Sequence, residues 1–306
     1  AVLEAQARFD GNDDDLVTFS SAADEFEHPT GWVPKEHALI AELDGEIVAW
    51  SRIQHQPFTG EDAYRSRGYV LPAYRRRGLG TVMLRRNEQD LVAFSRATPG
   101  TDPRWLHAWV NDRMPAAIAL FEKAGYEPFQ SYYLMIREAS SPRPPAPSTN
   151  LVTGPVTDAD LPAFGRLIDA AFRTQWGQWA WSDEEIEIYA AQARDDPTTD
   201  LSLWRAVRQS GELVAGIHAV YDAATRTAVI DELGTLPAWR GQGAASLLLS
   251  EALDELERRG AVRTTLSAAA DSPDALRIYE RFGFVTSVRG IGYRKAMPEG
   301  GYPAAG

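Results

Sequence analysis

The two halves of the chain repeat one another, and this constrains the fold more than any other feature. The segment VLPAYRRRGLG, from Val70 to Gly80, recurs as TLPAWRGQGAA from Thr235 to Ala245, 165 residues further on. A second segment, from Ala117 to Tyr126, recurs 158 residues further on and ends at Phe284. Two blocks in the same order and at nearly the same spacing indicate a duplicated domain.

A proline-rich stretch separates the two repeats. Residues 140–150, SSPRPPAPSTN, contain four prolines, which disfavour both helix and central strand and favour an extended linker. We therefore predict an N-terminal domain over 1–139, a C-terminal domain over 151–297 and a flexible tail over 298–306. The total of 306 residues suits two domains of about 150 residues each.

Composition excludes several classes of protein. The hydrophobic content of 44% is sufficient for buried cores, and no apolar run approaches the ~18 residues of a membrane span. A formal net charge of −12 argues against nonspecific nucleic-acid binding, which needs a basic face. The chain has no cysteine and its five histidines are scattered, so we expect neither a disulfide nor a metal site. No signal peptide is visible, and we expect a cytoplasmic protein.

The periodicity of the second half predicts alternating helices and strands. Helices are expected at 161–172, 183–193, 243–259 and 274–282, and strands at 201–207, 213–221, 227–236, 262–268 and 284–295. Ser182 followed by Glu185 forms a capping-box pattern at the start of the second helix. The first half follows the same order from His37 onward. This order predicts an α/β fold, a mixed α+β layer in which helices cover a sheet.

The repeated turn has the features of a pyrophosphate site. Gly241 and Gly243 let the backbone curl closely between a strand and a helix. The unpaired amides of the first helical turn, and the helix dipole, then favour an anion there. No Gly-Lys-Ser/Thr follows, and Ser246 stands where a dinucleotide fingerprint has its third glycine. The alternative reading is an ordinary glycine-rich turn, which the second copy makes less attractive.

With these motifs, both halves resemble the GCN5-related N-acetyltransferase (GNAT) superfamily. The resemblance rests on the loops Arg75-x-x-Gly78-x-Gly80 and Arg240-x-x-Gly243-x-Ala245. It rests also on the late-helix pattern Ala275, Tyr279, Gly283, Phe284. The tandem arrangement is similar to mycothiol synthase-like acetyltransferases. The resemblance implies two GNAT-like domains, each a mostly antiparallel sheet with a V-shaped splay flanked by helices.

The resemblance also implies acetyl-CoA as the acyl donor, with its pantetheine arm lying like a strand between the fourth and fifth strands. The residues implied to bind it are, in the second half, Thr235, Leu236, Arg240, Gly241, Gln242, Gly243, Ala244, Ala245 and Asp271, and in the first half Arg75, Arg76, Arg77, Gly78, Leu79, Gly80 and Thr81. The three arginines either pair with phosphates or belong to a solvated loop.

In this superfamily a late-helix tyrosine protonates the leaving thiolate, and carboxylates on the fourth strand often accept the proton of the amine. Tyr279 occupies the tyrosine position, and Asp231 and Glu232 lie on the strand ahead of the loop. Since neighbouring strand residues point to opposite faces, we expect only one carboxylate to face the cleft, and we favour Glu232. The alternatives are a solvent-facing carboxylate and a tyrosine that only packs under the sheet.

The first half differs at both of these places. Phe121 replaces the tyrosine, and Ser66 and Arg67 stand where Asp231 and Glu232 stand. We therefore expect the N-terminal domain to be catalytically degenerate. It either holds acetyl-CoA or braces its neighbour.

The function predicted is transfer of an acetyl group to a primary amine of a small molecule, by direct attack in the C-terminal domain. The alternatives are acetylation of protein lysines or N-termini, and a noncatalytic acyl-CoA sensor. We expect neither nucleic acid nor membrane as a partner. Trp176, Trp179 and Trp181 either form an aromatic wall for the acceptor or pack between the domains or in the core. His218 is expected to be structural.

Overall fold

The chain folds into two compact units, of which the first is built from two separate stretches of sequence and the second from one continuous stretch. The structure, a computed structural model, describes residues 31–58, 61–98, 100, 103–145, 147–175, 180–197 and 199–298. Unit 1 contains residues 1–131 and 290–306, and unit 2 contains residues 132–289. Trp176, Trp179 and the tail beyond residue 298 lie outside the described residues. None of the described helices combines the length and apolar character needed to cross a membrane.

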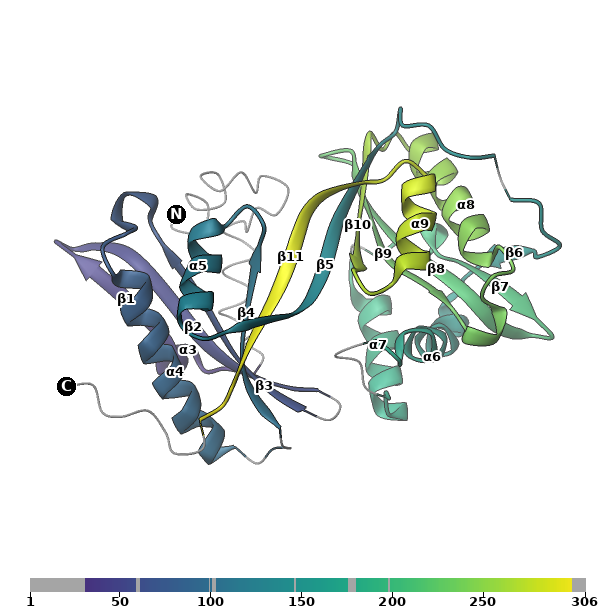
Figure 1. Cartoon of the computed structure of the whole chain (residues 1–306). Helices are drawn as coiled ribbons and strands as arrows, with labels where there is room; N and C mark the ends of the chain where they lie inside the picture. Colours follow the sequence, from purple (N-terminus) through teal and green to yellow (C-terminus); the bar gives the residue numbers. More distant parts are fainter. Residues whose placement is uncertain are drawn as a thin grey trace. The chain divides into compact units, whose positions relative to one another are not determined.

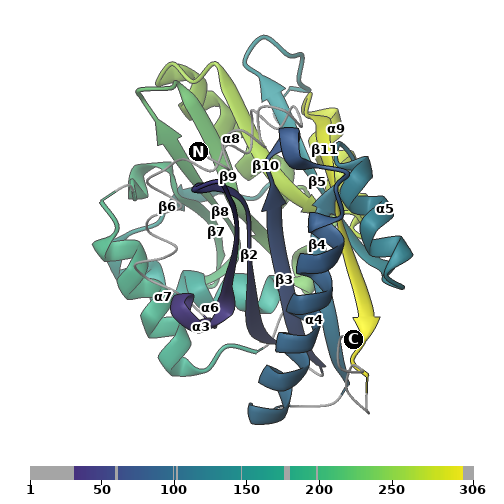
Figure 2. The same cartoon turned by 90° about the vertical axis from the view of Figure 1, so that its left-hand side faces the viewer.

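The sheet of unit 1 has the strand order β1-β2-β3-β4-β11 (Figure 1). Its elements are α3 (Pro34–His37), β1 (Ala38–Leu43), β2 (Glu46–Phe58), β3 (Glu61–Val70), α4 (Leu79–Ala97), β4 (Arg104–Asn111) and α5 (Pro115–Lys123), followed by the parts of β5 (Glu127–Glu138) and β11 (Val285–Ala296) that fall in this unit. Figure 2 shows α4 running along β2 and β3, and its buried Leu84 and Leu91 belong to the core of this unit.

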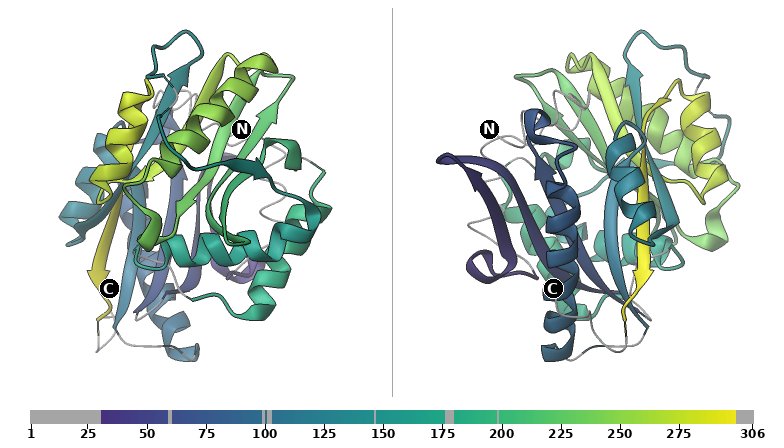
Figure 3. Two further views of the ribbon diagram at one scale, coloured as in Figure 1. Left: turned by 90° about the vertical axis from the view of Figure 1, so that its right-hand side faces the viewer. Right: turned by 60° about the vertical axis from the view of Figure 1, so that its left-hand side comes forward.

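The sheet of unit 2 has the strand order β5-β10-β9-β8-β7-β6. Its further elements are β6 (Thr153–Pro155), α6 (Leu161–Phe172), α7 (Asp183–Asp195), β7 (Arg205–Gln209), β8 (Glu212–Asp222), β9 (Thr227–Thr235), α8 (Ala244–Arg258), β10 (Arg263–Ala269) and α9 (Pro273–Arg281). Figure 3 shows α8 lying along β8 and β9. Helix α6 packs on β8 and β9, where Gly216 and Gly234 leave room for Phe164 and Ala171.

The last strand of each sequence repeat joins the sheet formed mainly by the other repeat. Strand β5, which ends the first repeat, joins the sheet of unit 2, and β11, which ends the second repeat, joins the sheet of unit 1; we call β5 and β11 the exchanged strands. Tyr132 to Glu138 of β5 pair antiparallel with β10 in unit 2. Gly290 to Ala296 of β11 pair antiparallel with β4 in unit 1. The domain boundaries predicted from the repeats follow sequence order, whereas the folded units follow strand pairing. The units therefore divide the chain within β5 and β11 and not at residues 139 and 297.

Buried charges hold the exchanged strands in place. In unit 2 the buried Arg137 donates hydrogen bonds to the Phe282 carbonyl at 2.9 Å and to Glu257 at 2.8 Å. In unit 1 the ammonium of Lys295 donates to the buried Glu88 at 3.0 Å. Each unit thus contains an ion pair between an exchanged strand and one of its own helices.

Both sheets open into a splay at the place that the resemblance implies. Strands β9 and β10 are parallel and pair from Thr227–Arg263 to Ile230–Leu266, while β9 continues to Thr235. Strands β3 and β4 pair in the same way as far as Arg65 and His107, while β3 continues to Val70. The predicted fold class is confirmed, because each sheet is mostly antiparallel, splayed at this point and flanked by helices.

The predicted helices of unit 2 are all present, with ends within two residues of those expected. Ser182 and Glu185 form the predicted capping box at the start of α7. The strand expected from residue 201 begins only at Arg205. A short 3-10 helix over Leu201–Leu203, capped by the side chain of Asp200, takes the first part of that stretch. Residues 140–150 contain no helix or strand where they are described.

Candidate functional site

The turn between β9 and α8 forms an open backbone cradle. Gly241 and Gly243 have φ of 76° and 87°, a region that side chains other than glycine rarely adopt. Gly243 is the N-cap of α8, and no side chain caps the helix. A Cβ atom added to Gly241 would meet no atom of the described residues within 4 Å, so the loop faces open space. Ala244 and Ala245 begin the helix, whose first amides lack intrahelical acceptors.

The other predicted donor-binding residues mainly hold this loop in shape. Arg240 donates to the carbonyls of Thr235 at 3.2 Å and Ala171 at 2.8 Å. The Gln242 side chain donates to the Ala238 carbonyl. The Thr235 hydroxyl is buried without a hydrogen-bond partner among the described residues. The amide of Leu236 donates to Val214, and Asp271 is exposed in the turn after β10.

The loop of unit 1 has nearly the same conformation. Arg76 and Gly78 have φ of 63° and 89°, matching Gly241 and Gly243. Arg75 donates to the carbonyl of Val70 at 3.1 Å, as Arg240 does to Thr235. The guanidinium of Arg77 donates to the Ala73 carbonyl. Leu79, Gly80 and Thr81 form the first turn of α4. Uncapped helix amides, an open glycine turn and a splayed sheet fit a pyrophosphate with an extended arm.

The hairpin of β8 and β9 contains a β-bulge. His218 pairs with Glu232 and Ala219 pairs with Ile230, so Asp231 has no partner of its own in the ladder. A bulge breaks the alternation of side chains. The carboxylates of Asp231 and Glu232 both lie 3.7 Å from Nδ1 of His218. The expectation that only one carboxylate faces the cleft is therefore wrong, because it assumed a regular strand.

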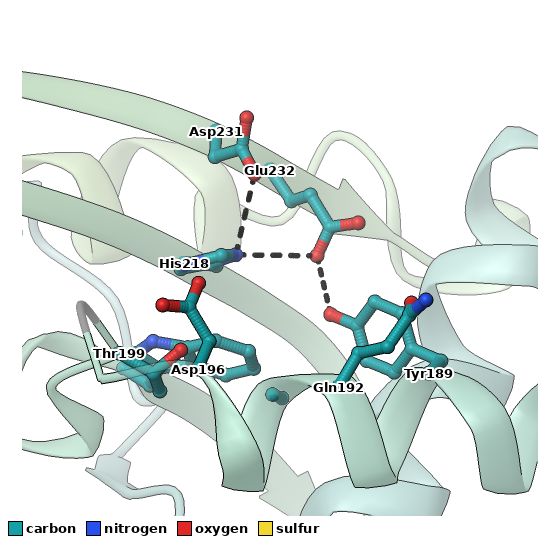
Figure 4. Close-up of a pocket in the computed structure, with 9 residues that line it drawn as sticks. Tyr189, Gln192, Asp196, Thr199, His218, Asp231 and Glu232 are labelled. Carbon is teal, nitrogen blue, oxygen red and sulfur yellow. Dashed lines mark hydrogen bonds and ion pairs between the residues drawn. The ribbon is translucent and has the colours of Figure 1, made fainter. Parts of the chain in front are cut away.

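These side chains line a pocket of about 490 Å³ (Figure 4). Its wall is formed by Tyr189, Gln192, Ala193, Asp196, Thr199, Trp204, His218, Asp231 and Glu232. The Tyr189 hydroxyl donates a hydrogen bond of 2.6 Å to Glu232. Burial raises the pKa of Tyr189, and the charge of Glu232 raises it further, so this hydroxyl stays a donor. The bond fixes one oxygen of Glu232 and leaves the other available.

Sequence reasoning missed His218 and Tyr189. His218 was expected to be structural, but it lines the pocket between two carboxylates, and its ring lies 3.9 Å from that of Trp204. Neither ring nitrogen of His218 makes a hydrogen bond within the described part of the chain. The one signal for it in the sequence is its place opposite Glu232 in the hairpin. Trp181 packs on Tyr189 with ring centroids 5.4 Å apart.

Tyr279 lies on α9, apart from this pocket. It does not line the pocket, and its ring meets that of Phe284 edge-on at 6.0 Å. Burial raises the pKa of the partly buried Tyr279 to about 12. Its hydroxyl therefore remains protonated, and able to donate, at any physiological pH.

In unit 1 the same places carry different chemistry. The hairpin of β2 and β3 is regular, and Arg52 pairs with Arg67 where His218 pairs with Glu232. Ser66 lies in a buried hydrogen-bonded group with Asn87 and Ser51. Phe121 meets Tyr126 edge-on at 5.3 Å, so the phenol is on the other ring of the pair.

The comparisons with known proteins agree with this architecture. The chain belongs to the acetyltransferase (GNAT) family, whose model matches residues 10–126 and 165–284. It is similar to a mycothiol acetyltransferase of Nocardia farcinica, with 27% identity over 83% of this chain and 81% of that protein.

Two solved structures share the fold. A GCN5-related N-acetyltransferase from Sphaerobacter thermophilus matches with a TM-score of 0.77 and 23% identity, over 97% of this chain and 90% of that one. A tandem GNAT protein from the clavulanic acid biosynthesis pathway matches with a TM-score of 0.58 and 17% identity, over 88% and 83%. The chain is thus a tandem GNAT protein and an acetyl-transferring acyltransferase.

Proposed function

We propose that unit 2 transfers the acetyl group of acetyl-CoA to a primary amine of a small molecule, which binds in the pocket beside β9. One observation carries this proposal. The bulge at Asp231 directs two carboxylates into a pocket at the splayed part of β9, the strand that leads into the backbone cradle. An amine held there lies next to the gap in which the family's donor would place its thioester.

Glu232 removes the proton of the attacking amine in this proposal. An ammonium ion with a pKa near ~10 has no lone pair for attack, so a base has to accept its proton first. Glu232 lies in the pocket, and the bond from Tyr189 fixes its orientation. His218, 3.7 Å away, is placed to share the proton once Glu232 has received it.

Acetyl-CoA supplies the activated acetyl group, since its thioester bond is broken as the new amide bond forms. Tyr279 is the proposed donor of a proton to the thiolate that leaves. Its raised pKa keeps the hydroxyl protonated until the C–S bond breaks, so that it has a proton to give to the thiolate, and the phenolate that results is reprotonated from solvent. The backbone cradle, which consists of the turn at Gly241 and Gly243 and the first turn of α8, is proposed to hold the diphosphate.

The test is release of CoA thiol from acetyl-CoA in the presence of a panel of small amines and of lysine and N-terminal peptides. We expect turnover with small amines. The Glu232→Gln variant should lower kcat by a factor of about 10²–10⁴ and leave acetyl-CoA binding unchanged by calorimetry. Glu212→Gln, which removes an exposed carboxylate at the start of β8, is the matched control and should behave as the wild type.

The outcomes separate the competing functions. Turnover with peptides alone would favour a protein acetyltransferase. Tight acetyl-CoA binding without thiol release from any acceptor would favour a sensor. Full activity of Glu232→Gln would remove this residue from the mechanism.

A further inference from the structure

The proline-rich stretch between β5 and β6 runs beside α8 and is bound to it (Figure 1). We call its residues 141–145 and 147–149 the strap; they form neither helix nor strand. The guanidinium of Arg143 donates to the Ser250 carbonyl at 3.2 Å and to the carboxylate of Asp254, which both belong to α8. The strap is therefore fixed along this helix, although its composition alone indicates an extended linker.

The last residue of the strap contacts the glycine turn that begins α8. The hydroxyl of Thr149 donates a hydrogen bond of 3.3 Å to the carbonyl of Gln242. The Cβ atom of Thr149 lies 3.8 Å from the position that a Cβ atom on Gly243 would take. The strap thus covers the side of the backbone cradle to which the Gln242 carbonyl points.

The bond from Thr149 determines where the amide of Gly243 points. In a trans peptide the C=O and the N–H of one peptide unit point in opposite directions. A Gln242 carbonyl held toward the strap therefore directs the Gly243 N–H away from it. This N–H has no hydrogen-bond acceptor among the described residues, so it is available to an oxygen of a bound anion. Because Gly241 and Gly243 flank the peptide, sterics alone restrain its rotation little.

The corresponding loop of unit 1 lacks this contact. Arg77 stands where Gln242 stands, and its carbonyl accepts no hydrogen bond within the described part of the chain. A Cβ atom on Gly78 would meet no described atom within 4 Å, whereas one on Gly243 would meet the strap. Since both loops have nearly the same backbone angles, the turn forms without a strap. What the strap adds is a restraint on the motion of the turn, which lowers the entropic cost of binding a ligand there.

From these contacts we infer that the strap preorganises the donor site of unit 2, and that Thr149 is a positioning residue for the diphosphate of acetyl-CoA. This inference rests on the proposed function of the cradle. Thr149 acts through the peptide between Gln242 and Gly243, whose N–H it orients toward the diphosphate before the donor binds. Arg143 holds the strap on α8 and acts through Thr149.

Removal of one hydroxyl tests the inference. Thr149→Val keeps the shape of the side chain and should raise the Kd and the KM for acetyl-CoA about fivefold, with kcat unchanged, as expected for the loss of one hydrogen bond. Thr149→Ser keeps the hydroxyl and should restore both constants. Ser148→Ala, which removes an exposed hydroxyl one residue earlier, is the control and should behave as the wild type. Calorimetry measures the Kd, and thiol release with an amine from the panel measures KM and kcat.

Two further measurements separate positioning from a general loss of stability. Arg143→Gln should weaken acetyl-CoA binding in the wild type and cause no further loss in Thr149→Val, because it acts through that hydroxyl. Acetylpantetheine has the thioester arm of the donor and no diphosphate. Its kcat/KM should be the same in the wild type, Thr149→Val and Thr149→Ser.

An unchanged Kd for acetyl-CoA in Thr149→Val, a failure of Thr149→Ser to restore it, or additive losses with Arg143→Gln would overturn the inference. Equal losses for acetyl-CoA and acetylpantetheine would also overturn it, since a strap that only stabilised unit 2 would have that effect. The two proposals fail separately. If the wild type binds no acetyl-CoA, the proposed function itself is rejected; if the wild type and Thr149→Val bind it equally, only the role of the strap is rejected.

Discussion

Two hairpins of one design occupy the same place in the two units and differ in what they carry. In unit 2 a bulge in β9 brings Asp231 and Glu232 to His218. In unit 1 the ladder of β2 and β3 is unbroken, and an Arg52–Arg67 pair replaces His218–Glu232. The two hairpins therefore differ by one bulge and by the charge of the side chains at this place.

The last helices of the two repeats, α5 and α9, also have similar backbones and different side chains. The Tyr279–Phe284 and Phe121–Tyr126 ring pairs cross at 65° and 66°. In unit 2 the first ring of the pair carries the hydroxyl, and in unit 1 the second ring carries it, with nearly the same angle between the rings. The glycine loops hardly differ. Both units therefore have the backbone cradle, whereas Asp231, Glu232 and the hydroxyl of Tyr279 have no counterparts at the same places of unit 1.

The largest effect is expected from the ion pairs of the exchanged strands. Lys295→Met leaves Glu88, whose side chain is 3% exposed, without its ammonium partner, which should cost unit 1 about 3–5 kcal/mol. Arg137→Met should cost unit 2 less, because Glu257 is 28% exposed and also contacts Arg143. Hydrogen exchange resolved by unit measures both. Unchanged protection of β4 in Lys295→Met would contradict the prediction.

The difference between the late helices can be tested by removing the hydroxyl of Tyr279 from α9 and adding one at Phe121 on α5. Tyr279→Phe should lower kcat about a hundredfold, with acetyl-CoA affinity retained, because only the proton donor is removed. Phe121→Tyr, the reciprocal change in unit 1, should leave turnover as in the wild type. Steady-state kinetics and calorimetry give both quantities. A gain of activity in Phe121→Tyr would show that unit 1 retains a working site.

A buried histidine distinguishes the two splays. The last residue pairs are Arg65–His107 in unit 1 and Ile230–Leu266 in unit 2. Burial, together with the positive charges of Arg65 and Arg294, lowers the pKa of His107 to about 3. Its unfolded pKa is near 6.5, so the unfolded chain binds the extra proton between about pH 6.5 and 3, and stability falls as the pH falls.

His107→Leu introduces the residue type that unit 2 has at this place, Leu266. This variant should remove the dependence of stability on pH that His107 causes. Between pH 7.5 and 5.5 the wild type should lose about 1.4 kcal/mol through this group, and the variant should not. Urea unfolding at the two pH values measures the difference. If the free energy of unfolding falls equally in the two proteins between these pH values, His107 does not titrate on unfolding.

The smallest effect is expected in the loops. Arg76 adopts a φ of 63° where unit 2 has Gly241, so Arg76→Gly should relieve backbone strain of about 1 kcal/mol. Gly241→Ala should cost about as much. Denaturant unfolding measures both the gain in stability of Arg76→Gly and the loss in Gly241→Ala. A destabilised Arg76→Gly would indicate that contacts of the arginine outweigh its backbone strain.

Local signals were sufficient for much of the fold. The capping box at Ser182 and the glycine turns fixed where α7 and α8 begin, because caps and turns act within a few residues. The bulge at Asp231, and with it the second carboxylate, depends on how β9 pairs with β8. A strand read by itself cannot show this, and the roles of His218 and Tyr189 depend on the same pairing.

The exchanged strands escaped prediction for a related reason. Nothing in the sequence of β5 or β11 names its partner, and the repeat suggested that each half closes on itself. The ladders of β5 with β10 and of β11 with β4 show which sheet each strand joins, and the ion pairs of Arg137 and Lys295 accompany them.

This arrangement has a consequence for any attempt to divide the protein. A protease that cut within residues 140–150 would produce two fragments, each holding one strand of the other's sheet. The nicked protein should stay associated until it is denatured. Two genes encoding the halves would have to be expressed together, because neither product could complete its own sheet.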